Sequence, residues 1–337
     1  MRATLGGSSL FDRGVDLGVA LGVLIALAGC NPAPGPGNDA AVDTGTPGND
    51  AAADTGPVMI TCPTGMVPNP SEQMGPCCYR VSQAAHLAMP ELRLRYLHLT
   101  APAGSALVTA TVQNVLNGSL TNETFNWLMR GSGGTGDGPI TITTGFGTRD
   151  ATAGTYAFST MAAYAPVMLN GTITGETVTT QPDPGVLVVP VFDAAGVVLQ
   201  VQLSLHNVSV VTSTFSEQRS CIGALATHGA FTTAATLSGY LTVTDTRGSM
   251  INVDPIHAEL CTLVASHNLT DPTSGPYCAQ AQSTWTVMPD SRCPATGPCV
   301  HDTGSGSVCS HDGTGATPCN AWQLVSDFAA VGVEINP

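Results

Sequence analysis

The segment that most restricts the fold is residues 199–206, in which apolar and polar residues alternate without exception. Because successive side chains of a β-strand point to opposite faces, this period of two predicts a strand with one buried face. The alternation changes phase after Asn207, where Val208 and Val210 become the apolar residues. The sequence therefore predicts a β-bulge or a strand end at His206 and Asn207.

Short apolar runs of the same kind recur along the chain. The further strands expected are residues 92–96, 140–142, 155–158, 186–192, 237–243 and 322–335. Pro190 cannot donate a ladder hydrogen bond, so residues 186–192 are expected to form an edge strand that pairs with residues 199–206. The Asn170-Gly171 pair predicts a tight type I′ hairpin turn.

Two helices are expected between these strands. Asp254 and Pro255 suit an N-cap and a first helical position, and apolar residues follow at helical spacing over residues 256–264. The second expected helix covers residues 122–130, with Glu123 in its first turn. Many short strands, few helices and Gly-rich turns predict an all-β fold, a mostly antiparallel β-sandwich or a jelly roll that is rich in disulfides.

Residues 1–29 have the features of an export signal. Two arginines precede an apolar run over residues 17–28, which suits a signal sequence but is short for a membrane span. The run ends at Leu27-Ala-Gly-Cys30, which resembles the lipobox of bacterial lipoproteins. This resemblance covers the signal segment alone. The alternative is an ordinary secretory signal in which the cysteine has no role.

The lipobox resemblance implies that Cys30 becomes the acylated N-terminus of the mature protein. Two or three acyl chains, palmitate among them, would hold the protein stably in a membrane of the bacterial cell envelope. Asn31 follows the cysteine where Asp would favour the inner membrane, so the analogy favours the outer membrane.

Residues 30–57 are expected to form a disordered tether behind this anchor. They are rich in Pro, Gly, Asp, Ala and Thr, and residues 37–45 recur almost unchanged as residues 48–56. Such a segment cannot bury enough apolar surface to offset the entropy of ordering it. Residues 58–337 are then the folded β domain, as one unit or as two smaller ones.

The cysteine count fits an exported domain. Ten of the eleven cysteines remain when the acylated one is set aside, and an oxidising compartment permits disulfides. The candidate disulfide cysteines are Cys62, Cys77, Cys78, Cys221, Cys261, Cys278, Cys293, Cys299, Cys309 and Cys319. Their connectivity cannot be read from the sequence, and Cys221 with Cys261 is the one pairing suggested.

Composition excludes several functions. All ten basic residues are Arg, so no lysine can form a Schiff base with pyridoxal phosphate or complete a phosphate-binding P-loop. The net charge of −14 would repel a phosphate backbone, so nucleic acid is not an expected partner. Residues 131–136 match G-x-G-x-x-G but lack the strand-then-helix context of a dinucleotide site. The chain has no G-x-S-x-G or H-E-x-x-H motif, and no catalytic residue or cofactor is predicted.

A ten-residue repeat near the C-terminus could carry a metal site. The residues are His301 and Asp302 in the first copy and His311 and Asp312 in the second, each pair two residues after a cysteine. Imidazole and carboxylate ligands from both copies could converge on a divalent cation such as zinc. The favoured alternative is that they are polar turn residues in a disulfide-bonded loop.

The leading functional hypothesis is a non-enzymatic, lipid-anchored envelope protein whose β domain binds a glycan or a protein. Glycan binding would predict exposed aromatic residues, and the chain has only Trp127, Trp285 and Trp322 as tryptophans. The alternatives are a hydrolase of envelope or extracellular polymers and a structural accessory lipoprotein of an envelope complex. Paired carboxylates or a Ser-His-Asp triad in a cleft would favour the hydrolase.

Overall fold

The computed structural model describes thirteen segments and one single residue of the chain. They are residues 66–68, 78–80, 87–133, 135–192, 199–215, 219, 221–222, 224–225, 231–233, 235–253, 256–265, 285–304, 308–311 and 317–337. All of them belong to the second of two compact units, residues 54–337. The expected signal peptide, Cys30 and the whole expected tether lie outside this part of the chain. In the described segments, no helix is both long enough and apolar enough to span a membrane.

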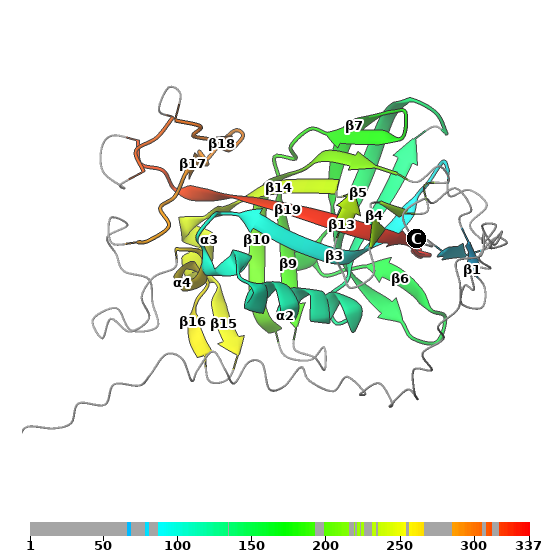
Figure 1. Ribbon diagram of the computed structural model, residues 1–337, viewed down its shortest axis with the longest axis horizontal. Coiled ribbons are helices and arrows are strands. Elements are labelled where there is room, and N and C mark those ends of the chain that lie inside the picture. Colours follow the sequence, from blue (N-terminus) through cyan, green and yellow to red (C-terminus); the bar gives the residue numbers. More distant parts are fainter. Residues whose placement is uncertain are drawn as a thin grey trace, which may run out of the picture. The chain divides into compact units, whose positions relative to one another are not determined.

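Eight antiparallel strands close into a barrel, because β19 pairs with both β3 and β14 (Figure 1). The strands follow one another around the barrel in chain order, which makes it an up-and-down meander. They are β3 (Glu91–Ala101), β4 (Trp127–Gly133), β5 (Gly138–Asp150), β7 (Val167–Thr174), β8 (Thr177–Thr180), β10 (Leu199–Thr214), β14 (Ala235–Thr242) and β19 (Ala321–Gly332).

The predicted mostly antiparallel β fold with few helices is confirmed, but the sheet closes into a barrel in place of the expected sandwich or jelly roll. Closure depends on β3 and β19, which are the first and last strands of the barrel. Phe328 of β19 lies opposite Leu97 of β3, although more than two hundred residues separate them in the chain. Local alternation predicts strands but carries no information about such a distant pairing.

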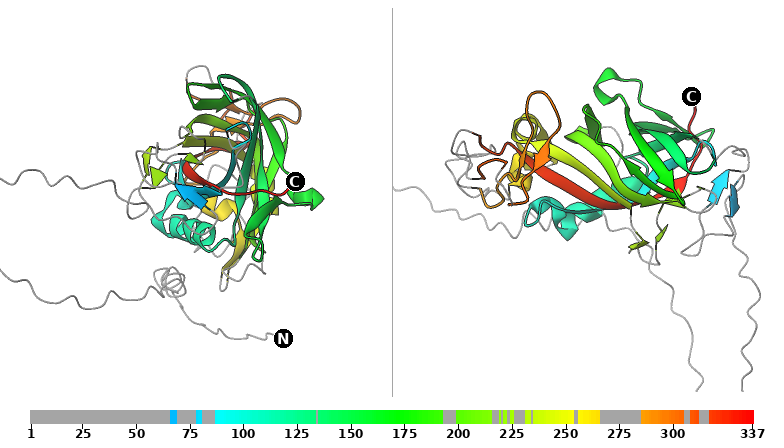
Figure 2. Two further views of the ribbon diagram at one scale, coloured as in Figure 1. Left: turned by 90° about the vertical axis from the view of Figure 1, so that its right-hand side faces the viewer. Right: turned by 90° about the horizontal axis from the view of Figure 1, so that it is seen from above.

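Shorter elements extend or flank the barrel. Extra strands paired to it are β6 (Thr155–Phe158), β9 (Val186–Phe192), β11 (Cys221–Ile222), β17 (Ser291–Arg292) and, through β17, β18 (Val300–His301). Two-stranded sheets are formed by β1 (Met66–Pro68) with β2 (Cys78–Arg80), β12 (Ala224–Leu225) with β13 (Phe231–Thr233), and β15 (Met250–Val253) with β16 (Ile256–Glu259). The helices are η1 (Ala106–Val108), α2 (Ala110–Thr121), η2 (Ala162–Tyr164), α3 (Val243–Gly248) and α4 (Cys261–Val264). Figure 2 shows β17 and β18 at one end of the barrel and the C-terminus at the other.

One face of every barrel strand contributes to a single apolar core. On β5 the contributing side chains are Ile140, Ile142 and Phe146, and on β19 they include Trp322 and Phe328. The three tryptophans are all buried. Burial of this kind stabilises the fold by about 25 cal/mol for each Å² of apolar surface removed from water.

Helix α2 completes the barrel where two strands separate. β3 and β4 pair only over Glu91–Arg93, so the β3 edge at Leu97 and Leu99 has no strand partner on that side. The Gln113 side chain of α2 accepts a hydrogen bond from the Leu99 N–H and donates one to its carbonyl. Asn117 makes the same two bonds with Leu97. The helix amides therefore satisfy backbone groups that a strand would otherwise bind.

The predicted bulge in β10 is confirmed. Asn207 has φ 48°, and the register of β10 against β14 shifts between His206 and Ser209. The predicted hairpin of β9 with β10 is also confirmed, and β10 is the only strand partner of β9 in the described part of the chain. The edge position explains how Pro190 is accommodated.

Other local predictions were wrong. Asn170 and Gly171 lie inside β7, and the turn to β8 lies at Gly175 and Glu176. These two residues have φ 52° and 66°, as the two central residues of a type I′ turn require. Gly171 is instead required by a close approach, because a Cβ there would lie 2.2 Å from the Thr179 carbonyl oxygen.

Both expected helices were misplaced. The one expected at residues 122–130 lies earlier, as α2, and residues from Trp127 onward form β4. Its N-terminal residue in the prediction, Asn122, is the C-cap of α2, and Glu123 follows with φ 61°. In the other expected helix, residues 256–259 form β16 and only residues 261–264 are helical. The apolar residues at helical spacing also fit a strand followed by one helical turn.

Candidate functional site

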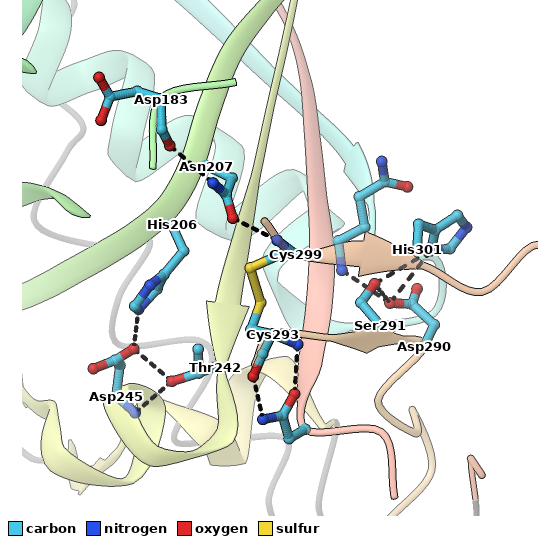
Figure 3. Close-up of a disulfide and its surroundings, with 12 residues drawn as sticks. Asp183, His206, Asn207, Thr242, Asp245, Asp290, Ser291, Cys293, Cys299 and His301 are labelled. Carbon is cyan, nitrogen blue, oxygen red and sulfur yellow. Dashed lines mark hydrogen bonds and ion pairs between the residues drawn. A yellow bond between two sulfur atoms is a disulfide. The ribbon is translucent and has the colours of Figure 1, made fainter. Parts of the chain in front are cut away.

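The predicted disulfide cysteines are bonded wherever the structure describes their side chains. Cys293 bonds to Cys299 (Figure 3), and Cys309 bonds to Cys319. Asn207, at the β10 bulge, accepts a hydrogen bond from the Cys299 N–H at 2.6 Å and donates one to the Asp183 carbonyl. This links the first disulfide loop to the barrel wall. Cys62, Cys77 and Cys278 lie outside the described residues, and only the backbone of Cys78 is described, in β2.

Cys221 and Cys261 are also disulfide-bonded, but their positions are incompatible with the suggested bond between them. Cys221 lies opposite Val331, near the C-terminal end of β19. Cys261 begins α4. At the end of that helix the Ala265 carbonyl accepts from the Val287 N–H, and the Val287 carbonyl accepts from the indole of Trp322, which lies at the other end of β19. Nine residues of strand separate these ends, about 30 Å, whereas bonded cysteines have Cα atoms within about 7 Å.

The two copies of the C-terminal repeat place their histidines in different surroundings. His301 lies on β18 beside Ser291, with its Nδ1 3.3 Å from the Ser291 Oγ and 3.7 Å from an Asp290 carboxylate oxygen. Ser291 is fully buried and donates its hydroxyl hydrogen to Asp290 at 2.7 Å. A catalytic triad needs serine and aspartate on opposite ring nitrogens. Here both approach the same nitrogen, so this group does not form the relay of a serine hydrolase.

Asp302 of the first copy instead meets His311 of the second. The His311 Nε2 lies 3.1 Å from an Asp302 carboxylate oxygen. The Gly304 N–H, which donates to this carboxylate, lowers the pKa of Asp302, and the bond with His311 acts in the same direction against desolvation. The sequence hypothesis expects side chains from both copies of the repeat to come together. Among the described residues, Asp302 and His311 are one such pair.

This pair does not make a metal centre from the described residues. Asp302, His311 and Cys319 have potential ligand atoms within 4.8 Å of one another. Cys319 is bonded to Cys309, however, and a disulfide sulfur offers no thiolate. Two ligands then remain, fewer than the three protein ligands of a catalytic zinc site. Asp312 lies outside the described residues.

A third polar cluster lies beside the disulfide segment. The Asp245 carboxylate accepts hydrogen bonds from His206 at 2.6 Å and from the Thr242 hydroxyl. Desolvation raises the pKa of Asp245, but these bonds outweigh it and the pKa is lowered. Figure 3 shows the cluster below the β10 bulge. The three side chains bond to one another, which is typical of structural contacts.

A buried ion cluster lies near the end of α2. Arg93 is 2 % exposed and donates to the Leu120 carbonyl and to the Asn126 side chain, and it lies 3.5 Å from Glu123. Burial lowers the pKa of Arg93 and raises that of Tyr156, whose hydroxyl donates to Glu123. The cluster links α2 to strands β3 and β6.

The outward surface of the barrel is different on the side formed by β4, β5, β7, β8 and β10. Ten neutral polar side chains cover it, and we call them the hydroxyl face. They are Ser132, Thr141, Thr143, Asn170, Thr172, Thr174, Thr177, Thr179, Thr212 and Thr214. Seven of them are exposed, and the three others, Thr141, Thr143 and Thr177, are half-buried. None of the ten is ionisable.

Strand register aligns the hydroxyl face in rows. One row runs Ser132, Thr141 and Asn170, and another runs Thr174, Thr177 and Thr214. Between them Thr172 lies opposite Thr179, with their hydroxyl oxygens 3.5 Å apart. Adjacent strands place neighbouring members of a row about 4.8 Å apart.

Sequence reasoning missed this face. The signal for it is the alternation of Ile or Val with Thr over residues 140–143, 172–174 and 177–179. That pattern predicts strands with a hydroxyl-bearing outer side, but only the register shows that these sides adjoin.

Comparisons of the chain with protein families, with curated proteins and with solved structures find no match.

Proposed function

We propose that this protein is a lipid-anchored protein of the bacterial cell envelope whose barrel binds an external partner through the hydroxyl face. The lipobox-like segment ending at Cys30 supports the anchor, and the outer membrane is the membrane we propose. The repetitive segment after the cysteine supports a spacer that lets the barrel reach outward.

The hydroxyl face is the observation that carries the binding role. A typical soluble surface carries roughly 25–35% ionisable side chains, whereas the ionisable side chain that strand register places opposite Thr143, Arg130, is already paired with Glu91. The side chains of the face project from a closed barrel whose backbone is hydrogen-bonded on both sides of β7. Threonine has few χ1 rotamers, so fixing these side chains on binding costs little entropy. A rigid and preorganised surface of this kind favours association.

The anchor is tested by mass spectrometry of the full chain expressed in a bacterial host. We expect a mature protein that begins at Cys30, carries acyl chains and is recovered with membranes. The Cys30→Ser variant lacks the thiol and is expected to be released. An unmodified N-terminus on the parent protein would contradict the anchor.

The binding role is tested with the full Cys30→Ser chain, which needs no detergent, and envelope fragments from the bacterium that makes the protein. We expect the chain to sediment with the fragments, and the added Thr172→Val and Thr179→Val pair to lower the association constant about tenfold. Thr100→Val with Thr148→Val is the matched control, because both threonines are exposed outside the hydroxyl face. Equal sedimentation of the two double variants would contradict the proposal.

A further inference from the structure

We infer that the partner of the hydroxyl face is a neutral polysaccharide. This inference rests on the proposed function, since it names the partner of the same surface. It is carried by the charge of the face, by its hydrogen-bonding groups and by its repeating geometry.

Charge is the first argument. The two carboxylates at the strand ends beside the face are both engaged, since Asp137 accepts from the Gly175 N–H and Glu176 pairs with Arg219. The ten side chains of the face themselves offer a charged polymer no ion pair, and Arg130, which lies opposite Thr143, is already paired with Glu91. The chain also carries a net charge of −14, which repels anionic polymers as a whole. A neutral polymer is not repelled by the net charge and needs no ion pair.

Hydrogen bonding is the second argument. Each threonine hydroxyl is one donor and two acceptors, and each sugar hydroxyl has the same capacity. The contacts within the face fix some of these groups, because the Thr141 hydroxyl donates to Asn170 at 3.2 Å and Thr172 meets Thr179. Threonine methyl groups and the exposed Met168, which lies opposite Thr143, add apolar contact for the C–H groups of a sugar ring.

Geometry is the third argument. Rows of hydroxyl groups repeat about every 4.8 Å across the strands and about every 6.7 Å along them. A polymer with regularly repeated hydroxyl groups can engage several rows at once, and such multivalency raises affinity without any single strong contact. All three tryptophans are buried, so no tryptophan can stack on a sugar ring at this surface. Binding would depend on the hydroxyl groups and not on the exposed aromatic residues that glycan binding would predict.

A protein partner fits this face less well. Protein interfaces concentrate aromatic residues, Met and Arg at their centre, where most binding energy arises. The ten residues of the hydroxyl face include none of these, and of the two such residues opposite Thr143 only Met168 is exposed, since Arg130 is bonded to Glu91 and to the Ile335 carbonyl. A second copy of this chain would meet the same difficulty.

The test is sedimentation of the full Cys30→Ser chain with insoluble polysaccharides at low and high salt. The probes are cellulose, starch and mannan as neutral polymers, alginate beads as an anionic polymer and chitosan as a cationic one. We expect retention on at least one neutral polymer that salt leaves unchanged, because exposed ionic contacts are screened by salt and neutral ones are not.

The Thr172→Val, Thr179→Val variant is expected to bind that polymer about tenfold more weakly, since each hydroxyl bond contributes about threefold. The Thr100→Val, Thr148→Val control is expected to stay within twofold of the parent.

Three outcomes would overturn the inference. They are no retention on any neutral polymer, retention that does not distinguish the two double variants, and self-association of the parent that the face variant loses. If envelope sedimentation still depends on the hydroxyl face while no neutral polymer binds, the inference fails and the proposed function stands.

Discussion

The two sides of the barrel use their polar side chains in different ways. On the side covered by α2, the amides of Gln113 and Asn117 are bonded to the backbone of β3, and the buried Arg93 is bonded to the Leu120 carbonyl. On the other side β7 is paired along its length with β5 and β8, so the outward hydroxyl groups of β7 are not needed to satisfy its backbone. The difference separates polar residues that hold the fold from polar residues that are available for binding. Substitutions should therefore change stability on the first side and binding on the second.

The largest effect is expected from Gln113→Ala on the covered side. The change removes both partners of the buried Leu99 peptide groups, and each unsatisfied group costs about 1–3 kcal/mol. We expect the free energy of unfolding in urea to fall by about 2–4 kcal/mol. Asn114→Ala, at an exposed position of the same helix, is the control and should change it by less than about 0.5 kcal/mol. Similar losses of unfolding free energy in both variants would contradict the role of Gln113 in satisfying the Leu99 backbone.

Gly171→Ala should destabilise the hydroxyl side through its backbone. The added Cβ would meet the Thr179 carbonyl, which belongs to a paired strand and cannot easily move. We expect a loss of about 1–3 kcal/mol in thermal or urea unfolding. Gly239→Ala, where the nearest atom is 3.4 Å away, is the comparison and should cost less. An unchanged stability of the Gly171 variant would show that β7 and β8 are less tightly held than described.

Acid should weaken the cluster beside the disulfide segment. Because the pKa of Asp245 is lowered in the folded state, its contribution is complete above the ordinary carboxyl pKa, about 4, and is lost as the pH falls below it. Asp245→Asn should remove about 0.5–1.5 kcal/mol at neutral pH and less at pH 3. Urea unfolding of parent and variant at pH 3, 5 and 7 measures this. If the difference in unfolding free energy between parent and variant grew as the pH fell, the lowered pKa of Asp245 would be contradicted.

Gly118→Ala should stabilise the covered side slightly. The added methyl group meets no atom within 4 Å, and alanine is favoured over glycine in a helix by about 0.5–1 kcal/mol. A rise in melting temperature checks this. A fall would mean that α2 packs more closely at this point than the structure describes.

The smallest effect on stability is expected at the hydroxyl face itself. Thr172→Val with Thr179→Val keeps the branched shape of both side chains and exposes no unsatisfied backbone group. The free energy of unfolding should change by less than about 0.5 kcal/mol. A loss above about 1 kcal/mol would place these hydroxyl groups with the residues that hold the fold.

The sequence predicted strands better than helices, for a physical reason. Apolar and polar residues alternate cleanly in Ile140–Thr143 of β5 and in residues 199–206 of β10, because the inner side is apolar and the outer side is solvated. In α2 the side toward β3 carries the buried Gln113 and the half-buried Asn117, and these amides interrupt the apolar period that identifies a helix. Local patterning is therefore weakest where polar groups are buried for tertiary reasons.

The site was less predictable than the fold. The cysteine and histidine motifs were visible in the sequence, but only the structure shows that Asp302 meets His311 while His301 lies beside Ser291. The hydroxyl face depends on strand register, which sets Thr172 opposite Thr179. A shift of one residue would turn these side chains inward.

The most direct test of the central claim is the oxidation rate of Met168 in the full Cys30→Ser chain, measured by mass spectrometry with and without envelope fragments. This methionine is 64% exposed and lies on β7 beside the hydroxyl face, so a partner bound there covers it. We predict oxidation several-fold slower in the bound protein, and no such protection in the Thr172→Val, Thr179→Val variant. Unchanged oxidation of Met168 in protein that is bound would show that another surface does the binding.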